Sequence, residues 1–234
     1  MGKAKDLATG ASYVDTVGDG MTGNLGVGGA ANGTYAITSH SSGGANLRLE
    51  NDGEVGFIRL EDDGDLNIWA HGDENISFLT GTGSGTTRMN IDGSGRVTKP
   101  NQPSFRAGSS GGISSGSSIS TLVLPNVKHN VGNHYNSSNY TFTCPVAGIY
   151  YFGFHGNVRD VGGNATTSVY GQIMKNGSRV GIYYSSDNPD GAWHLISGQA
   201  VVSCAANDAI LVSSNANAYW DSSDWTQFYG HLLG

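Results

Sequence analysis

Between residues 119 and 233 the sequence is a succession of short runs of β-branched and aromatic residues, separated by Gly, Pro, Asn and Asp. Runs of this length, with turn residues between them and no helical periodicity, predict antiparallel strands. About eight such strands in one stretch are typical of a β-sandwich or a β-barrel. We expect these strands at residues 119–124, 139–143, 149–158, 168–175, 178–184, 193–203, 209–214 and 226–233.

The composition agrees with an all-β chain. Gly provides 37 of the 234 residues and only 13% of the residues are charged, so the residues that favour long helices are scarce. The net charge is −7 and no basic stripe occurs, which argues against binding to nucleic acid. No apolar run reaches the roughly 18 residues of a membrane-spanning helix, and no secretory signal is recognised.

Three segments of different composition predict the domain organisation. Residues 1–39 carry many Gly and few large apolar residues, so we expect an arm that orders against a partner. Residues 40–98 contain short alternating apolar pairs, namely Leu47/Leu49, Leu66/Ile68, Ile76/Phe78 and Met89/Ile91. Such short strands cannot bury an apolar face within one chain, which predicts a β stalk of three intertwined chains. Residues 99–234 then form a head, after a junction stiffened by two prolines.

Formal matches to cofactor and catalytic motifs are better interpreted as turns. Residues 18–23 (GDGMTG) match a dinucleotide-binding fingerprint, but no helix-forming segment follows them. Residues 108–112 and 112–116 match a nucleophile elbow inside a Ser/Gly tract, where composition alone produces such matches. The Asp-rich turns of the stalk fit neither the EF-hand nor the nonapeptide Ca²⁺ spacing. We therefore expect no catalytic residue, no metal and no cofactor.

Six segments of the head resemble the globular domains of complement C1q-like proteins. Residues 140–152 (YTFTCPVAGIYYF) are similar to the family's FTCPVPGLYYF core segment. The order and spacing of five further segments agree as well. These are residues 103–107 (PSFRA), 132–136 (GNHYN), 175–177 (KNG), 197–208 (SGQAVV followed by ND) and 228–233 (FYGHLL). The resemblance implies a ten-strand jelly-roll sandwich that assembles as a homotrimer.

Two segments outside the head resemble phage tail-fibre proteins. Residues 17–25 (VGDGMTGNL) are similar to the GDxMTGxL segment of those proteins. Residues 91–100 (IDGSGRVTKP) are similar to a segment that precedes their terminal domain. The joint resemblance implies a tail fibre, located in the virion tail and assembled in the host cytoplasm. Residues 1–39 would attach it to a tail protein, and the head would recognise the host.

Two other functions stay open. A head fibre or capsid decoration protein would have the same architecture, because attachment depends on the partner that residues 1–39 meet. A glycan-degrading enzyme is less favoured. Its paired carboxylates, Asp187/Asp190 and Asp221/Asp224, lie in Ser/Asn/Gly-rich loops where solvent keeps their pKa values ordinary. The sequence therefore favours a protein that is not an enzyme.

The resemblance also implies which strand faces are buried. Tyr150, Phe152 and Phe154 share one strand face and should fill the core, as should Phe228 and Leu232 of the last strand. The opposite faces are expected to form the trimer interface. Its expected members are Tyr151, His155, Tyr229, His231 and Leu233. We expect each His to bond to a neighbouring carbonyl, with an ion on the threefold axis as the alternative.

The two cysteines, Cys144 and Cys204, are expected to lie close together. In the family's sheet order, the strand that begins near residue 148 runs antiparallel to the strand that ends near residue 204. Assembly in a reducing cytoplasm disfavours a disulfide. We therefore expect two buried, reduced thiols that behave as small apolar groups.

Receptor binding is expected in the head loops, because loops carry the binding sites of rigid β scaffolds. Aromatic faces stack on the C–H surfaces of sugars, and Asp accepts hydrogen bonds from hydroxyls. The candidate residues are Tyr184, Asp187, Asp190, Trp193, Trp220, Asp221, Asp224 and Trp225. We expect Trp220 to be exposed, whereas the favoured interpretation of Trp193 and Trp225 is that they cap the core. The ligand would be a host-surface glycan or an outer-membrane protein.

Overall fold

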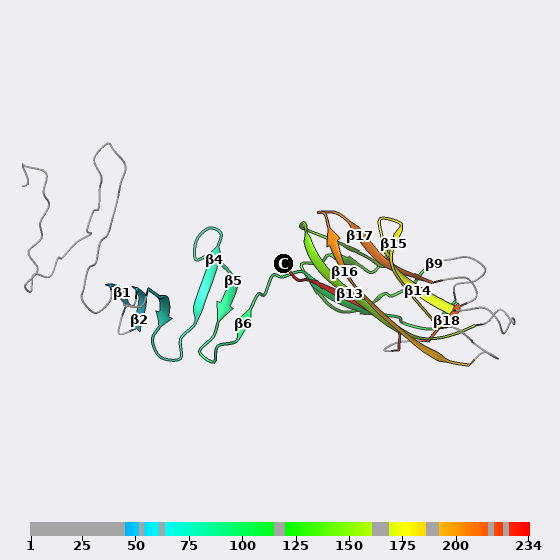
Figure 1. Cartoon of the computed structure of the whole chain (residues 1–234), viewed down its shortest axis with the longest axis horizontal. Coiled ribbons are helices and arrows are strands. Elements are labelled where there is room, and N and C mark those ends of the chain that lie inside the picture. Colours follow the sequence, from blue (N-terminus) through cyan, green and yellow to red (C-terminus); the bar gives the residue numbers. More distant parts are fainter. Residues whose placement is uncertain are drawn as a thin grey trace, which may run out of the picture. The chain divides into compact units, whose positions relative to one another are not determined.

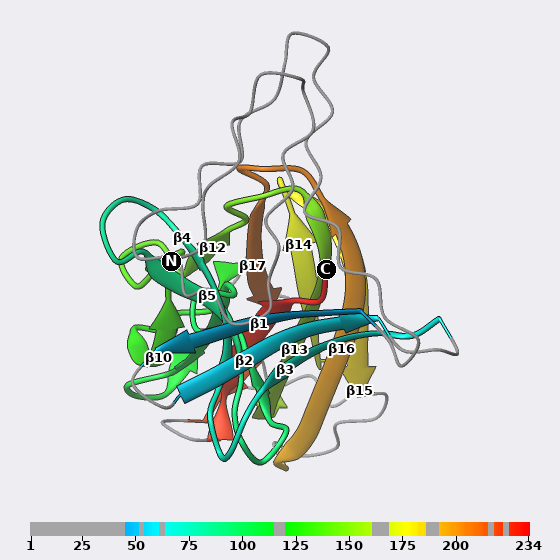
Figure 2. The same cartoon turned by 90° about the vertical axis from the view of Figure 1, so that its left-hand side faces the viewer.

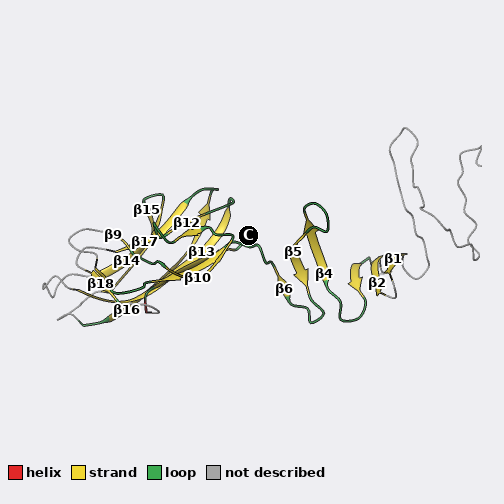
Figure 3. Ribbon diagram, turned by 180° about the vertical axis from the view of Figure 1, so that it is seen from behind, coloured by secondary structure: helices red, strands yellow, loops and turns green. Residues whose placement is uncertain are grey.

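The structure is a computed structural model, in which the chain divides into two units, Met1–Gly72 and Asp73–Gly234 (Figure 1). It describes residues 45–51, 54–60, 64–114, 120–160, 169–185, 192–214, 218–221 and 225–234. These residues form strands and turns without an α-helix (Figure 3), so the expected all-β class is confirmed. A membrane-spanning helix is not found in this part of the chain.

The described part of the first unit is a three-stranded antiparallel sheet in the order β1-β2-β3. Its strands are β1 (Ala45–Asn51), β2 (Glu54–Leu60) and β3 (Leu66–Ala70). The rings of Phe57 and Trp69 pack across β2 and β3 with centroids 5.4 Å apart. Ile68 and Trp69 point to opposite faces of β3 and both are exposed. Neither face of this sheet is therefore buried within one chain.

The second unit begins with a smaller antiparallel sheet, in the order β4-β5-β6. Its strands are β4 (Ile76–Thr80), β5 (Thr86–Ile91) and β6 (Val97–Thr98). Phe78 and Leu79 of β4 are both exposed. All the apolar pairs expected in the stalk lie in strands, while the intertwining of three chains stays a prediction.

The head that follows is a sandwich of two antiparallel sheets (Figures 1 and 2). The first sheet has the order β10-β7-β19-β13-β18-β8, and β16 pairs with the other edge of β13. Its strands are β7 (Ser104–Gly108), β8 (Ile113–Ser114), β10 (Asn126–Val131), β13 (Gly148–Asp160), β16 (His194–Cys204), β18 (Ala218–Trp220) and β19 (Gln227–Leu232).

The second sheet has the order β11-β12-β17-β14-β15, and β9 pairs with β17. Its strands are β9 (Ser120–Thr121), β11 (Tyr135–Asn136), β12 (Thr141–Thr143), β14 (Val169–Lys175), β15 (Ser178–Ser185) and β17 (Ala209–Ser214). Each of the eight strands predicted between residues 119 and 233 overlaps an observed strand. In the head the structure adds β7, β8, β10, β11 and β18, which the apolar pattern did not reveal.

The core between the two sheets is dominated by aromatic rings. Phe105 of the first sheet stacks on Phe142 of the second with ring centroids 4.7 Å apart. Tyr150, Phe152 and Phe154 of β13 point into this core and are fully buried, as their i, i+2 spacing predicted. Stacked and edge-on aromatic pairs stabilise such a core beyond the burial of their area.

Two glycines make room for the largest buried side chain, Trp220. A Cβ atom added to Gly156 would lie 2.4 Å from Cε3 of Trp220, and one added to Gly171 would lie 3.1 Å from Cη2 of Trp220 and 2.5 Å from Cζ of Phe154. Because no real Cβ approaches another atom so closely, these positions fix the depth of the indole in the core.

Both ends of the head domain lie at one end of the sandwich. The backbone N–H of Leu232 donates to the carbonyl of Pro103 at 3.0 Å, and that of Ile149 donates to the carbonyl of Gly234 at 2.9 Å. The long strand β13 runs from this end to Asp160 at the other, which we call the loop end.

Candidate functional site

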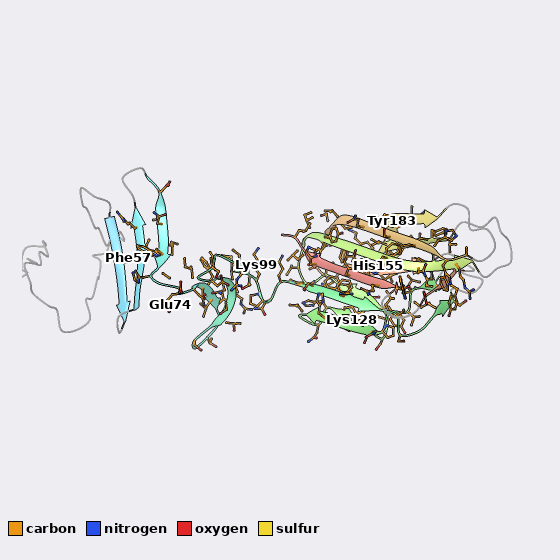
Figure 4. All side chains as sticks on the ribbon, turned by 90° about the horizontal axis from the view of Figure 1, so that it is seen from below. Phe57, Glu74, Lys99, Lys128, His155 and Tyr183 are labelled. Carbon is orange, nitrogen blue, oxygen red and sulfur yellow. The ribbon has the colours of Figure 1, made fainter. Side chains whose placement is uncertain are left out.

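The face of β13 that points away from the core carries a ladder of aromatic and imidazole rings. The ring of Tyr151 lies 5.4 Å from His231 and 6.5 Å from Tyr229, and His155 lies 6.1 Å from Tyr229. Figure 4 shows His155 on this sheet. The four side chains come from two paired strands, β13 and β19, in which each residue faces its cross-strand partner or a diagonal neighbour.

The ladder is polar at its edges and only partly buried. The hydroxyl of Tyr151 donates to the amide oxygen of Gln199 on β16. Burial and the neighbouring Tyr151 raise the pKa of Tyr229. His231 and Leu233 are exposed. The five interface candidates therefore lie outside the core, and their role in a trimer stays a prediction.

At the loop end, the same outward face carries a cluster of three residues, Arg159, Trp193 and Tyr219, here called the arginine cluster. The guanidinium carbon of Arg159 lies 5.0 Å from the centroid of Trp193 and 5.1 Å from that of Tyr219. The two rings are 5.9 Å apart in an edge-on arrangement. Both distances to Arg159 are within the range of favourable cation–π contacts.

Strand pairing brings these three residues together. Arg159 on β13 is directly opposite Tyr219 on β18, and Trp193 immediately precedes β16 on the other side of β13. The Nε atom of Arg159 is buried and has no hydrogen-bond partner among the described residues. Contacts with two aromatic rings restrict the motion of the planar guanidinium.

The next residues along this face add polar groups to the cluster. The Asn157 side-chain nitrogen lies 3.5 Å from a carboxylate oxygen of Asp221. The backbone of Asp221 is fixed, because its N–H donates to the Asn157 carbonyl at 2.7 Å and its carbonyl accepts from Thr226 Oγ1 at 2.8 Å. Leu195, on the same face of β16, is 69% exposed. The loop end therefore combines aromatic, cationic, amide and carboxylate groups.

The expectation that Trp220 is exposed is wrong. Trp220 has no accessible surface, packs against Phe154 and donates from Nε1 to the Ser214 hydroxyl at 2.7 Å. The physical reason is that residues 218–220 form strand β18 rather than a loop, so Trp220 alternates inward while Tyr219 points outward. Trp220 is consequently not available to stack on a ligand.

The favoured interpretation of Trp193 and Trp225 is also wrong, since neither caps the core. Trp193 is 43% exposed and Trp225 is 62% exposed. Trp193 belongs to the arginine cluster, together with Arg159 and Tyr219, which are not among the candidate residues predicted from the sequence. Asp187, Asp190 and Asp224 lie outside the described residues, as does the side chain of Tyr184.

A polar hollow of about 370 Å³ lies near β5 and is lined by Asp73, Asn75, Asp92, Gly93, Ser94 and Arg96. Asp92 accepts hydrogen bonds from the backbone N–H groups of Ser94 and Arg96 and from the Arg96 side chain, and these bonds lower its pKa. The carboxylate is therefore engaged within its own turn. Within the residues described, no group of three or more His, Cys, Asp or Glu side chains could hold a metal ion.

Cys144 and Cys204 are buried, free thiols. Cys144 directly follows β12, and Cys204 is the last residue of β16, where it pairs with Gly148 of β13. Burial, followed by a hydrogen bond between the thiols, raises the pKa of Cys144, and burial raises the pKa of Cys204. Their expected proximity and burial are confirmed.

Part of this chain is similar to known proteins. A murine protein, complement C1q tumor necrosis factor-related protein 3, is 29% identical over 119 residues, which are 49% of this chain and 45% of the murine protein. The chain thus spans less than half the length of this curated relative. Among solved structures, the globular domain of zebrafish complement 1qA matches with 17% identity and a TM-score of 0.43, covering 57% of this chain and 98% of the zebrafish chain. Murine APRIL at pH 8.5 matches with 17% identity and a TM-score of 0.46, covering 56% and 99%.

The family assignment rests on the sequence of the head. The family model described as C1q domain matches residues 104–233, which is more than half of the chain. The matched range begins with β7 and ends just beyond β19, which are paired strands of the first sheet. The chain belongs to the C1q domain family.

Proposed function

We propose that this protein is a non-enzymatic, homotrimeric binding protein whose head recognises a ligand at its loop end. The observation that carries the proposal is the outward face of the sheet around β13, where the aromatic ladder and the arginine cluster lie outside the core. Rings and cations in such positions are more typical of recognition surfaces than of a solvated sheet face.

Exposed apolar side chains on the same face support the homotrimer. Leu195 and Val201 point outward from β16, and Ile149 points outward from β13. Together with the ladder they form an apolar surface that a second copy would cover. The exposed apolar residues on both faces of β3 call for partner chains in the stalk as well. In this proposal the ladder of each copy faces the threefold axis.

We further propose that the trimer is a phage virion fibre, with the tail as its location and the host cytoplasm as its place of assembly. The support is the resemblance of residues 17–25 and 91–100 to tail-fibre segments. Residues 17–25 lie outside the described residues. Residues 91–100 contain the Asp92 turn and β6, which directly precede the head. In this proposal residues 1–39 attach the fibre to a tail protein, and a head fibre is the second candidate.

Recognition of a host-surface glycan or an outer-membrane protein would then belong to the head. Trp193 and Asp221 are the described candidates that lie on the outward face of the loop end. Trp225 is exposed and precedes β19. The hollow near β5 is lined by two carboxylates, Asp73 and Asp92, and Asp92 is engaged by Arg96, which does not favour a glycosidase.

Competition with phage adsorption tests the proposal. The full-length chain, first shown to be a trimer by sedimentation, is added to host cells before the phage. The proposal expects fewer adsorbed particles as the protein concentration rises, with no release of reducing sugar from the envelope glycans. A protein that neither binds cells nor competes is a structural component only. Separate pull-downs with purified tail and capsid proteins distinguish a tail fibre from a head fibre.

A further inference from the structure

The arginine cluster is built to receive an oxygen acceptor. Arg159 carries a permanent charge, its Nε atom is buried, and neither a hydrogen bond nor an ion pair is made by its side chain to the described residues. A buried donor without an acceptor costs free energy, and a charged one costs more. We propose that the arginine cluster binds a sugar that carries a carboxylate, an inference that rests on the proposed recognition function of the head.

The geometry of the guanidinium favours a carboxylate as the acceptor. Trp193 and Tyr219 contact Arg159 by cation–π interactions and restrict the motion of its plane. The donors of a guanidinium lie along its edge in a fork that matches the two oxygens of a carboxylate. Because the rings hold the fork in place before binding, little side-chain entropy is lost when the ligand arrives.

The residues around Arg159 favour a sugar as the carrier of that carboxylate. Trp193 keeps 43% of its surface exposed beside the guanidinium, which leaves ring area for the C–H face of a sugar. Asn157 and Asp221 lie in the next row of the same face and offer amide and carboxylate groups to sugar hydroxyls.

The position of the cluster separates it from the aromatic ladder. The ladder residue Tyr151 pairs with His231 near the end of the sandwich where Pro103 and Gly234 lie. Arg159 pairs with Tyr219 at the loop end. A carboxylate from a second copy of the chain could meet the same guanidinium. The experiment below distinguishes such a contact between copies from the binding of a sugar.

The experiment measures binding of the full chain to matched pairs of oligosaccharides. Each pair consists of an oligosaccharide containing galacturonic, glucuronic or N-acetylneuraminic acid and its carboxyl-reduced counterpart, which differs only in the acid group. Wild type is compared with R159K, which keeps the charge without the planar fork, and with R159Q. The matched control is R179Q, which removes an exposed arginine from β15 on the other sheet. Calorimetry gives affinity, and sedimentation of each variant gives its oligomeric state.

We expect at least one acidic oligosaccharide to bind about tenfold to a hundredfold more tightly than its reduced counterpart, the range expected for charge-assisted hydrogen bonds. R159Q should remove this preference, R159K should weaken it, and R179Q should keep it. The inference is overturned if no acid form is preferred or if R159Q keeps the preference. It is also overturned if R159Q dissociates the oligomer while wild type binds no sugar, because the acceptor then comes from a second copy.

The adsorption assay separates failure of this inference from failure of the proposed function. If wild type competes with phage for host cells but prefers no acidic sugar, the proposed recognition function stands and only the inference of an acidic ligand is refuted. If wild type prefers an acidic sugar but does not compete with phage, the inferred ligand class is supported and the proposed role in adsorption is refuted.

Discussion

The indole Nε1 of Trp220 donates a 2.7 Å hydrogen bond to the hydroxyl of Ser214 inside the head core. The bond links β18 of one sheet to β17 of the other, so a single side chain connects the two layers of the sandwich at the loop end. Tyr219, the residue before Trp220, belongs to the arginine cluster. The anchoring of Trp220 inside therefore fixes the position of Tyr219 outside.

Truncation of this anchor should destabilise the head strongly. W220A removes a fully buried indole and leaves a cavity, for which we expect a loss of about 3–5 kcal/mol in the free energy of unfolding. Chemical denaturation at a fixed protein concentration measures it. W225A, which removes an exposed indole, should change stability by less than about 1 kcal/mol. Equal losses for the two variants would contradict the burial of Trp220.

Filling the space above the indole should also destabilise the protein. A Cβ at residue 156 would lie 2.4 Å from Trp220, so G156A forces the ring or the strand to move, at a cost of about 1–3 kcal/mol. G111A is the matched control, because a Cβ there would meet no atom within 4 Å. A G156A protein as stable as G111A would show that the core has room around Trp220.

A charge on the outward face of β16 should dissociate the trimer. V201D places three carboxylates in the surface that the copies are proposed to cover, where unpaired charges are costly. V180D introduces the same charge on an exposed position of β15 in the other sheet. We expect a sedimentation mass of three chains for wild type and V180D, and a smaller mass for V201D. The proposed interface is refuted if V201D remains a trimer.

The paired thiols should make stability fall in alkaline solution. Burial raises the pKa of Cys144 and Cys204 in the folded head, whereas unfolded thiols titrate near pH 8.5. Above that pH the unfolded chain loses protons that the folded chain keeps, so each thiol lowers the free energy of unfolding by about 1.4 kcal/mol per pH unit. Denaturation between pH 7 and pH 10 measures the slope. C144A should have a shallower slope, and an unchanged slope would show that the thiols titrate alike in both states.

Accessibility of the same thiols gives a separate prediction. We expect native protein to react slowly with a thiol reagent, because both sulfur atoms are buried. Unfolded protein should titrate two thiols before and after treatment with a reductant. Thiols that appear only after reduction would indicate a disulfide.

The alternation of the long strands could be predicted from the sequence because apolar residues repeat at every second position. The spacing of Tyr150, Phe152 and Phe154 placed them on one face of the strand, and the family resemblance implied that this face is the buried one. The pattern failed for Trp220, whose strand has only three residues between turn-rich segments. A strand that short carries too few alternating positions to define its inward face.

The arginine cluster could not be predicted for a different reason. Arg159 and Tyr219 are far apart in the chain, and their contact depends on the register between β13 and β18. Trp193 joins them only because β16 pairs on the other edge of β13. Register between distant strands is a property of the whole sheet, and no local spacing reports it.

The bonds from Leu232 to Pro103 and from Ile149 to Gly234 place residue 234 at the opposite end of the sandwich from Arg159. Immobilisation through a tag after Gly234 would therefore orient the head on a sensor chip with its loop end toward the solution. Coupling through surface lysines would orient it at random. The backbone thus offers a simple way to capture the molecule in a uniform orientation, with the arginine cluster accessible to soluble glycans.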